Sequence, residues 1–307
     1  MSKIAFIFPG QGAQACGMGK DFYEQTETGK RIFDKATELM GFSMPQLCFE
    51  ENDRLDITEY TQAAMVTASI AMMRVLEENG IKPDVAAGLS LGEYCALAAA
   101  GVMSDEDAIR TVRQRGILMQ EAVPVGEGAM AAILALDASA IEEVTGAMEG
   151  VWIANYNCPG QIVISGEKAA VEDACEKLKA AGAKRAVMLN VSGPFHSGML
   201  ADAGEKLGEV LSQVELHEPQ IPYVANVTAQ YVKSAAEVKE LLTRQVSSSV
   251  RWQQSVEAMI ADGVDTFIEI GPGKTLAGFM RKISRDVKTL NVEKLEDISK
   301  VAEALKS

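Results

Sequence analysis

The sequence predicts an α/β fold: a main domain built around a parallel sheet, with a smaller α+β subdomain inserted in mid-chain. Three observations support this prediction. Short apolar runs typical of buried parallel strands occupy residues 3–8, 85–87 and 266–270. Residues 88–92 form a Gly-x-Ser-x-Gly turn between a predicted strand and a predicted helix. Residues 128–189 predict the order β-α-β-β-α-β, which closes on itself.

The composition is that of a folded intracellular protein. With 307 residues, 48% of them hydrophobic, the chain can bury a large core. A net charge of −14 and a pI near 4.7 argue against a nucleic-acid-binding surface and against docking to an anionic membrane. Five cysteines without a C-x-x-C pair argue against a disulfide framework or a zinc site. No apolar run reaches membrane-spanning length, and the cysteine pattern fits a reducing compartment. We therefore expect a cytoplasmic protein, and we expect no bound metal.

The first predicted strand, residues 3–8, is followed by Pro9 and a glycine-rich loop. Residues 10–15 satisfy the loose G-x-G-x-x-A pattern of dinucleotide-binding loops. However, Pro9 intervenes, and the acidic residue expected about 20 positions later falls in a helical pattern. Residues 126–131 match the same pattern, so it has little specificity. We therefore do not predict a nucleotide site in this loop.

Helical periodicity predicts three helices around the serine turn. They cover residues 21–40, 61–79 and 104–121. On the third helix, Arg110 and Arg113 are interpreted as part of a solvated face. Arg115 differs because Gly116 follows it, and a glycine there would leave room for a ligand.

Ser90 lies at the tip of a sharp strand-to-helix turn, with a helix predicted over residues 94–100. Gly88 and Gly92 would let the strand and helix backbones approach closely while the serine hydroxyl stays exposed. At this helix N-terminus, the dipole and the N–H of Leu91 would favour a developing oxyanion. The alternative is an ordinary glycine-bounded turn whose serine caps a helix.

The middle of the chain predicts a ferredoxin-like unit. Its strands are expected at residues 130–134, 151–155, 162–165 and 186–189, its helices at 139–148 and 168–181, and a turn at 157–160. Natural hinges flank it at residues 124–126 and 192–194. We therefore expect a first segment of the main domain at residues 1–125, the inserted subdomain at 126–193 and the second segment at 194–307.

After the insert, the pattern returns to alternating helices and strands. The predicted helices cover residues 199–214, 236–246, 252–262 and 298–306, with another after residue 273, and the predicted strands cover 221–225, 266–270 and 289–292.

The chain has only two histidines that could activate a serine. His217 lies in a polar connection and is expected to be an exposed loop residue. His196 lies where the insert returns to the main domain, where it can face a cleft between the two. If Ser90 is a nucleophile, His196 is its base by elimination. The alternative for His196 is a buried residue whose ring is satisfied by the backbone.

Five short motifs occur in order along the chain. They are Phe-Pro-Gly-Gln-Gly at residues 8–12, Gly-Leu-Ser-Leu-Gly-Glu-Tyr at 88–94, an arginine 25 residues after the serine, Gly-Pro-Phe-His-Ser at 193–197 and Glu-Ile-Gly-Pro-Gly at 269–273. Together they resemble the malonyl-CoA:acyl carrier protein transacylase family, over essentially the whole chain. An α/β-hydrolase-like main domain with an inserted ferredoxin-like subdomain is what the resemblance implies.

The resemblance also implies the roles of the central residues. Ser90 would be the nucleophile, His196 the general base and acid, and Arg115 the clamp on the free malonyl carboxylate. Gln11 and Leu91 would supply the backbone N–H groups of an oxyanion hole. Arginine suits the clamp because its planar fork matches the two carboxylate oxygens.

Three further residues match family positions. Gln245 would orient the histidine through its main-chain carbonyl, Asn157 would line the site from the insert, and Phe195 resembles malonyl-selective members. As an alternative, Phe195 is only a packing residue. Two departures stand out: Leu89 replaces a histidine common before the serine, and residues 249–252 read Ser-Val-Arg-Trp where many members have Pro-Val-x-Trp.

The implied reaction is a ping-pong transfer of malonyl from malonyl-CoA to the pantetheine thiol of acyl carrier protein. It needs no cofactor, and we expect a monomer. Because the carrier protein is acidic in this family, its docking would need a local basic patch. Our hypothesis draws this patch from Lys184, Arg185, Arg281, Lys282, Arg285 and Lys288, and the alternative is ordinary solvated surface charge.

The sequence offers two alternative functions. A serine esterase would require the order serine, acid, histidine, which Asp173 or Asp202 could complete, but its HGGG-type oxyanion loop is absent. A carrier-protein-binding scaffold with a dead site would be expected to lack Ser90, His196 or Arg115, and all three are present.

Overall fold

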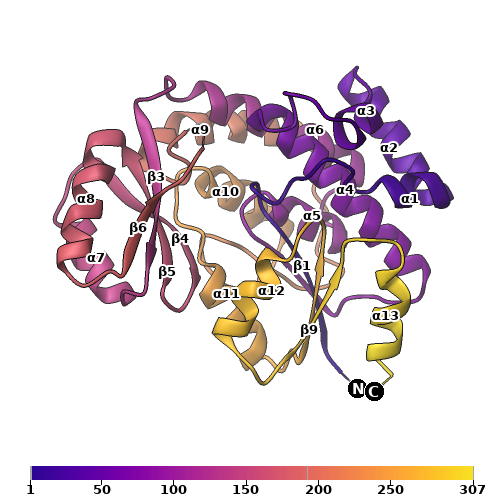
Figure 1. Cartoon of the computed structure of the whole chain (residues 1–307). Coiled ribbons are helices and arrows are strands. Elements are labelled where there is room, and N and C mark those ends of the chain that lie inside the picture. Colours follow the sequence, from indigo (N-terminus) through magenta and orange to yellow (C-terminus); the bar gives the residue numbers. More distant parts are fainter. Residues whose placement is uncertain (1, 192, 307) are drawn as a thin grey trace.

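A computed structural model describes residues 2–191 and 193–306. It contains a five-stranded sheet of order β7-β2-β1-β8-β9 and a separate four-stranded sheet of order β4-β5-β3-β6 (Figure 1). Strand pairs are parallel in the first sheet and antiparallel in the second. The predicted α/β class is thus confirmed in its coarse form, a mixed structure with a parallel sheet and a separate antiparallel sheet.

The parallel sheet forms the centre of the larger part of the molecule. Its strands are β1 (Ile4–Phe8), β2 (Val85–Gly88), β7 (Tyr223–Val224), β8 (Thr266–Ile270) and β9 (Lys288–Val292). Along β1, Phe6 and Phe8 join one buried cluster while Ala5 and Ile7 join another. Because successive side chains of a strand point to opposite faces, both faces of the sheet are covered.

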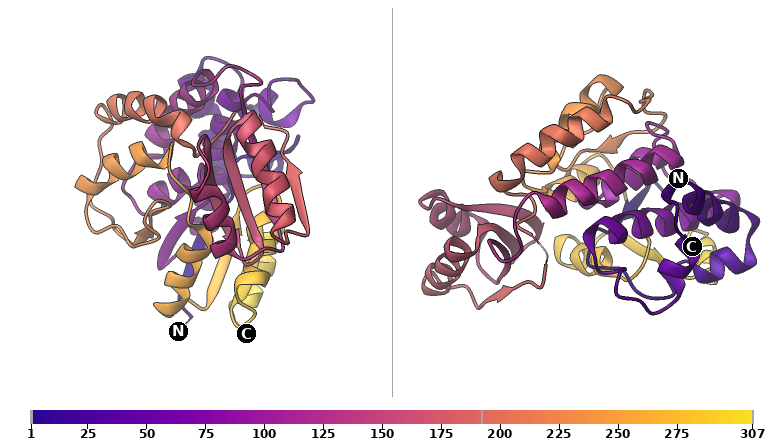
Figure 2. Two further views of the ribbon diagram at one scale, coloured as in Figure 1. Left: turned by 90° about the vertical axis from the view of Figure 1, so that its left-hand side faces the viewer. Right: turned by 90° about the horizontal axis from the view of Figure 1, so that it is seen from above.

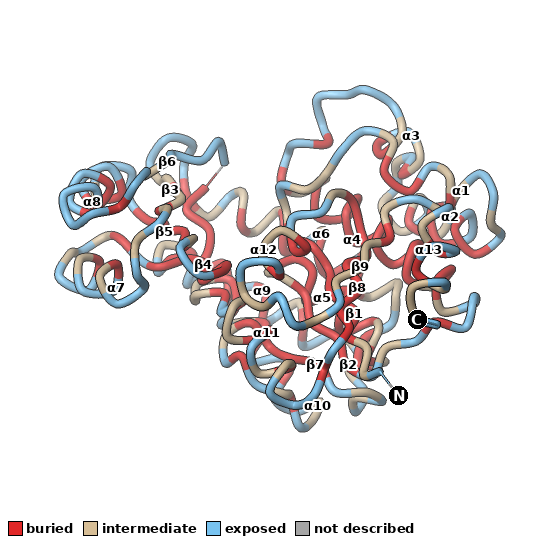
Figure 3. Tube along the Cα trace, turned by 60° about the horizontal axis from the view of Figure 1, so that its bottom comes forward, coloured by how far each residue is buried: buried red, intermediate tan, exposed pale blue. Residues whose placement is uncertain are grey.

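Helices cover both of these faces. They are α1 (Lys20–Gln25), α2 (Glu27–Met40), α3 (Met44–Phe49), α4 (Thr58–Glu78), α5 (Gly92–Ala99), α6 (Asp105–Glu121), α9 (Ala201–Leu211) after the short turn η1 (Gly198–Leu200), α10 (Ala235–Gln245), α11 (Trp252–Ala261), α12 (Thr275–Ile283) and α13 (Asp297–Ala304). Strands β1, β2 and β8 and helices α4 and α5 are the most continuously buried segments (Figure 3).

The antiparallel sheet projects to one side of the parallel one (Figure 2). Its elements, in chain order, are β3 (Gly128–Leu134), α7 (Ala138–Gly146), β4 (Val151–Cys158), β5 (Gln161–Glu167), α8 (Lys168–Ala180) and β6 (Arg185–Met188). Ala131 and Ile133 pack in its own cluster with α7 and α8, whereas Met130 belongs to the main cluster. One sheet face therefore carries the two helices and the other faces the larger part.

Several predicted boundaries are wrong. The single helix expected over residues 21–40 is two helices, because Thr26 adopts an extended conformation and its side chain accepts from the Gly29 N–H as an N-cap. Helix α3, which begins after the N-cap Ser43, is too short for periodicity to find. The strand expected over residues 221–225 is only two residues long. The hinge expected at residues 192–194 begins at residue 192, which lies outside the described residues.

Two other predicted ends also shift. Strand β4 continues to Cys158, so that the turn expected at residues 157–160 is reduced to its last two positions. The helix predicted to reach residue 214 ends at Leu211. Within the described ranges, no helix combines the length and the apolar character that a bilayer crossing needs.

Candidate active site

The turn at Ser90 is built by close contact between strand and helix. Ser90 adopts φ 52, in the left-handed region that a non-glycine residue rarely occupies. A Cβ on Gly88 would lie 2.0 Å from the Gly92 carbonyl carbon, and one on Gly92 would lie 2.2 Å from the Phe8 oxygen. Both positions therefore require glycine, and the hydroxyl is held at the N-terminal end of α5.

Asn226 holds this strained turn in place. Its Oδ1 accepts from the Ser90 N–H at 2.6 Å, and its Nδ2 donates to the Gly88 carbonyl at 2.6 Å. The residue follows β7, which lies beside β2 in the sheet. Sequence reasoning missed Asn226, and a polar residue just after a predicted strand is the only signal that could have found it.

The structure brings His196 directly to the serine. The Ser90 Oγ lies 2.7 Å from His196 Nε2, and His196 Nδ1 lies 2.8 Å from the main-chain oxygen of Gln245. Because a carbonyl only accepts, Nδ1 donates to it, which leaves Nε2 free to accept the serine proton. The histidine is 4% exposed.

The surroundings of His196 keep its ring neutral. Burial, followed by the positive charge of Arg115, lowers the pKa of His196 to about 4, against a partial opposing effect of the Gln245 carbonyl. At neutral pH the ring is therefore an available proton acceptor.

Arg115 points at the same hydroxyl. Its side chain is 1% exposed, and its Nη2 lies 3.1 Å from Ser90 Oγ and 3.0 Å from the Gln245 Oε1. Its Nη1 donates to Gln62 Oε1 at 2.8 Å. Burial lowers the pKa of Arg115, partly offset by Tyr94 and Glu93. Among the described residues, no carboxylate forms an ion pair with this guanidinium, and its Nε–H has no acceptor.

The neighbours of Arg115 differ from the expectation. Gly116 does not open space for a ligand, since a Cβ there would lie 2.7 Å from the Glu59 Cα, and it serves the close crossing of α4 and α6. Gln62, on α4, was not predicted as a site residue. Arg113 is not part of a solvated face, because its side chain is only 18% exposed and pairs with the partly buried Glu59. Arg110 is exposed, as expected.

The two backbone N–H groups expected in an oxyanion hole belong to neighbouring loops. Gln11 follows β1 and Leu91 follows β2, and these strands are paired in parallel. In the part of the chain that the structure describes, neither N–H donates to another residue. The Gln11 side chain donates instead to Thr58 Oγ1 at 3.1 Å.

The remaining predicted residues lie around this centre. Phe195 is buried in the main cluster, next to the histidine in sequence. Asn157 is buried on β4, and its Oδ1 has no hydrogen-bond partner among the described residues. Asn157 makes no hydrogen bond to Ser90 or His196, so the structure does not join it to them directly. His217 is exposed, as expected.

A comparison with known proteins identifies the family of the chain. Residues 5–300 match the family model described as the acyl transferase domain. The chain belongs to the acyl transferase family.

Similar acyl transferases include proteins that are named for malonyl transfer. The malonyl CoA-acyl carrier protein transacylase of Bacillus subtilis is 50% identical over 311 residues, which cover 100% of this chain and 98% of that protein. An acyl carrier protein S-malonyltransferase from Vibrio cholerae has a crystal structure with a TM-score of 0.95 and 42% identity, covering 98% of this chain and 100% of that one.

A third similar structure includes a partner. It holds a type II PKS acyl-carrier protein in complex with its malonyl-transacylase. The match has a TM-score of 0.95 and 40% identity, and it covers 99% of this acyl transferase and 100% of that chain.

This acyl transferase also has a buried carboxylate behind the serine, which sequence reasoning did not assign. Glu93 is 1% exposed, and its Oε2 accepts from Gln245 Nε2 at 2.6 Å and from the Asn226 N–H at 3.2 Å. Burial raises the pKa of Glu93 to about 7, with the two hydrogen bonds and Arg115 acting in the opposite direction. Only its place within the serine motif could have drawn attention to it.

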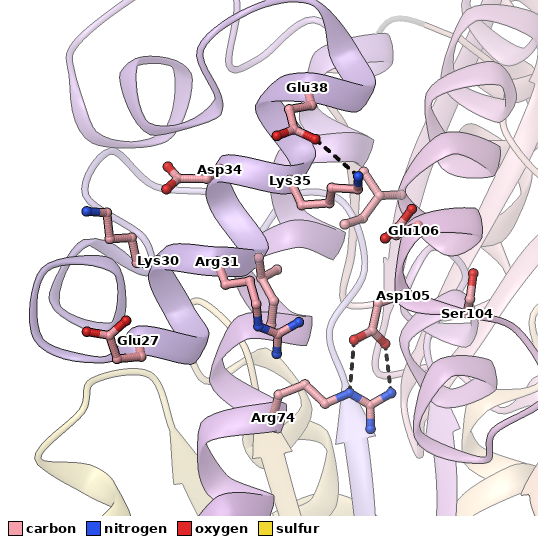
Figure 4. A pocket seen from close by; sticks show the side chains of 12 residues that line it. Glu27, Lys30, Arg31, Asp34, Lys35, Glu38, Arg74, Ser104, Asp105 and Glu106 are labelled. Carbon is pink, nitrogen blue, oxygen red and sulfur yellow. Dashed lines mark hydrogen bonds and ion pairs between the residues drawn. The ribbon is translucent and has the colours of Figure 1, made fainter.

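A pocket of 820 Å³ lies elsewhere, between α2, α4 and α6 (Figure 4). Its charges are mixed: Arg74 binds Asp105 with two hydrogen bonds, and Lys35 pairs with Glu38. None of the predicted site residues lines it. Within the described ranges, no group of histidine, cysteine and acidic side chains could hold a metal ion.

Proposed function

We propose that this acyl transferase moves the malonyl group from malonyl-CoA to the pantetheine thiol of acyl carrier protein, through a malonyl ester on Ser90. One observation carries the proposal: a buried guanidinium without a carboxylate partner among the described residues lies 3.1 Å from the Ser90 hydroxyl. The similar proteins named above, which act on malonyl-CoA and acyl carrier protein, support the same substrates.

In the first half-reaction, Ser90 Oγ attacks the thioester carbonyl while His196 Nε2 takes the hydroxyl proton. The N–H groups of Gln11 and Leu91 stabilise the oxyanion of the tetrahedral intermediate. Its collapse breaks the carbon–sulfur bond, and His196 gives its proton to the departing CoA thiolate. The products are free CoA and malonyl-Ser90.

In the second half-reaction, the carrier protein's thiol attacks the ester carbonyl. His196 takes the thiol proton and returns it to Ser90 Oγ as the ester bond breaks. Protons and electrons balance within the two half-reactions, so the proposal includes no cofactor and no metal. The main-chain carbonyl of Gln245 keeps the histidine in the required tautomer.

Selectivity for malonyl follows from the cost of an unpaired buried charge. A malonyl carboxylate bound to Arg115 would supply the missing partner, in the bidentate geometry that arginine favours. An acetyl group leaves the guanidinium uncompensated, so the same residue disfavours it. Phe195 and Asn157 complete the proposed acyl site. Phe195 is buried and precedes the histidine in sequence, and Asn157 is buried on β4, which supports this assignment.

We also propose a finer description of the fold. The main domain would be α/β-hydrolase-like, from residues 1–125 and 194–307, and the insert at 126–193 would be ferredoxin-like. The elbow at Ser90 supports the first assignment, and the element order with sheet order β4-β5-β3-β6 supports the second. We further propose a monomeric, cytoplasmic enzyme, consistent with five free cysteines.

The esterase alternative is not favoured by the contacts of His196. Its Nδ1 donates to a main-chain carbonyl, not to a carboxylate. Asp173 pairs with Lys177 on the exposed face of α8, and Asp202 is exposed on α9. Neither aspartate therefore completes a triad with the histidine.

Intact-protein mass spectrometry tests the proposal. Protein mixed with malonyl-CoA should gain one malonyl group, located on Ser90 by peptide mapping, and holo acyl carrier protein should remove it. Ser90→Ala should gain nothing, while Ser104→Ala, which changes an exposed helix cap, should label normally. Labelling by acetyl-CoA but not by malonyl-CoA would overturn the assigned substrate.

A further inference from the structure

The proposed reaction leaves the buried Glu93 carboxylate without a task. It lies on α5, one turn after the nucleophile, and both residues that donate to it also contact the site. Asn226 holds the Ser90 N–H, and Gln245 holds both His196 and Arg115. Glu93 Oε1 has no partner among the described residues, so all its hydrogen bonds converge on Oε2.

The side-chain amide of Gln245 lies between Glu93 and Arg115. Its Nε2 donates to Glu93 Oε2 at 2.6 Å and to the Ser90 main-chain oxygen at 3.0 Å. Its Oε1 accepts from Arg115 Nη2 at 3.0 Å. An amide has one donating and one accepting end, so a strong acceptor on one side decides which end faces the other.

The opposite orientation would be unfavourable. If the amide were flipped, its NH₂ group would face the guanidinium, which has only donors, and its oxygen would face the acceptor Oε2. The contact to Glu93 is the shorter of the two that fix the NH₂ end. This acceptor persists in both charge states of Glu93, since a proton would occupy the unpartnered Oε1.

The orientation of the amide then sets that of the guanidinium. Arg115 Nη2 is held between Gln245 Oε1 and Ser90 Oγ, while Nη1 is held by Gln62. An arginine fixed in this way presents its guanidinium beside Ser90 Oγ, the atom that carries the acyl group in the proposed reaction. Pre-organisation of this kind lowers the cost of binding a carboxylate there.

We propose that Glu93 is a positioning residue for acyl selectivity: through the Gln245 amide, it orients Arg115 beside Ser90 for substrates that carry a carboxylate. The inference rests on the proposed function of the site.

The readout is the ratio of kcat/KM for malonyl-CoA to that for acetyl-CoA, because a purely structural role would lower both values alike. Glu93→Met removes the acceptor and should lower this ratio about tenfold, mainly through a higher KM for malonyl-CoA. Glu93→Gln keeps an acceptor oxygen and should retain the ratio within about threefold. Equal losses in the two variants, or a parallel loss for both substrates, would overturn the proposal.

A second variant guards against misfolding of Glu93→Met. Gln245→Met removes the amide but keeps the main-chain carbonyl that holds His196, and it should lower the ratio at least as much. An unchanged ratio in Gln245→Met would contradict the proposal.

The matched control is Glu269→Met. Glu269 is also fully buried, accepts from the N–H groups of Leu276 and Ala277, and has a pKa raised to about 7 by burial. It has no contact with Arg115 among the described residues, so its loss should reduce stability and leave the ratio unchanged. A ratio that falls as far in Glu269→Met would also overturn the proposal.

The wild-type protein separates the two hypotheses. Failure of the wild type to form malonyl-Ser90 would overturn the proposed function itself. Normal labelling of the wild type with an unchanged ratio in the Glu93→Met and Gln245→Met variants would overturn only the role of Glu93.

Discussion

At the scale of single residues, the proposed chemistry depends on a buried guanidinium and a buried carboxyl group near one hydroxyl. Arg115 and Glu93 are both 1% exposed, and among the described residues the Gln245 amide forms a hydrogen bond with each of them. Such an indirect pair leaves the guanidinium short of one full partner. In the proposed function, a substrate carboxylate would supply that partner, so that one contact would provide both binding and selectivity.

Replacing Arg115 should therefore separate malonyl transfer from acetyl transfer. In Arg115→Ala, kcat/KM for malonyl-CoA should fall about 30-fold or more, since the loss of a buried charged hydrogen-bond partner costs about 2–5 kcal/mol. Transfer from acetyl-CoA should fall far less. Steady-state kinetics with both donors measure the two values.

Arg110→Ala is the matched control for this change. The residue is on the same helix, but it is exposed and pairs with Glu106 and Asp107. Exposed pairs contribute little, so malonyl transfer should be unaffected. Parallel losses for malonyl and acetyl transfer in Arg115→Ala would contradict the clamp.

The pKa of His196, lowered to about 4, predicts an unusual acid limit for the serine's reactivity. The ring stays neutral down to about pH 4, so inactivation of Ser90 by phenylmethylsulfonyl fluoride should persist well below pH 6.5. A neutral reagent is chosen because it does not titrate in this range. An acid limb centred at pH 6.5 would show that the histidine is not buried as described.

The same shift has a consequence for stability. The unfolded chain binds a proton at His196 with a pKa near 6.5, whereas the folded chain resists protonation down to about 4. The free energy of unfolding should therefore fall by about 3 kcal/mol from this residue as the pH decreases from 6.5 to 4. His196→Gln should reduce this loss in urea denaturation at the two pH values.

The individual residues differ in how far sequence could reveal them. Ser90, His196 and Arg115 carry reactive or charged groups in recognisable motifs, and the structure brings them together. Asn226 and Glu93 act through contacts more than 130 positions apart in the chain. No local sequence pattern encodes such contacts, because the order of the strands in the sheet determines which distant residues meet.

At the scale of elements, the crossing of α4 and α6 aligns Gln62 with Arg115. Gly116 permits this crossing, since a Cβ there would lie 2.7 Å from the Glu59 Cα and 3.0 Å from the Thr58 oxygen. Periodicity predicted both helices but not their separation. The distance between two helices depends on which residues meet at the crossing, and that information is absent from either helix alone.

Gly116→Ala should push the two helices apart. We expect a loss of about 1–3 kcal/mol in the free energy of unfolding, as for overpacked cores, and a higher KM for malonyl-CoA because Gln62 would no longer reach Arg115. Urea denaturation and steady-state kinetics measure the two effects.

Gly278→Ala provides the control. This helical glycine lies on α12, and a Cβ there would meet no atom within 4 Å. Alanine should therefore stabilise the protein by about 0.4–1 kcal/mol without changing the KM. If Gly116→Ala were equally stabilising, the crossing would not be as close as the structure indicates.

At the scale of the whole molecule, the site is assembled by strand order. Gln11, Ser90 and Asn226 follow β1, β2 and β7, which are neighbours in the sheet although β7 comes much later in the chain. His196 is contributed by the segment that returns from the antiparallel sheet. The sequence predicts the strands and the insert. It does not predict that β7 pairs with β2, because apolar runs do not specify which strands are neighbours in a sheet.

The charge distribution suggests where an acidic partner could approach this acidic chain. Arg281, Lys282 and Arg285 are exposed at and after the end of α12, and they have no ion pair among the described residues. Lys282 lies near Cys158, at the end of β4. The strand register places Arg185 at the same end of that sheet, three strands away, or about 14 Å. We propose this group of cations as the docking patch for acyl carrier protein.

Reversing two of these charges should impair only the step that uses the carrier protein. In the double variant Arg281→Glu and Lys282→Glu, the KM for acyl carrier protein should rise about tenfold, and the salt dependence of transfer should weaken. Malonylation of Ser90 by malonyl-CoA should keep its rate. Ser90 lies at the carboxyl ends of the parallel strands, and α12 runs away from these ends. Single-turnover labelling and transfer assays separate the two steps.

The control carries the same change in net charge at another place. Lys177→Glu and Lys179→Glu alter two exposed lysines of α8 that already pair with Asp173 and Glu176. If overall repulsion were the cause, both double variants would weaken transfer equally. A loss confined to the α12 variant requires a local patch, whereas unchanged carrier-protein kinetics in that variant would leave these cations as ordinary surface charge.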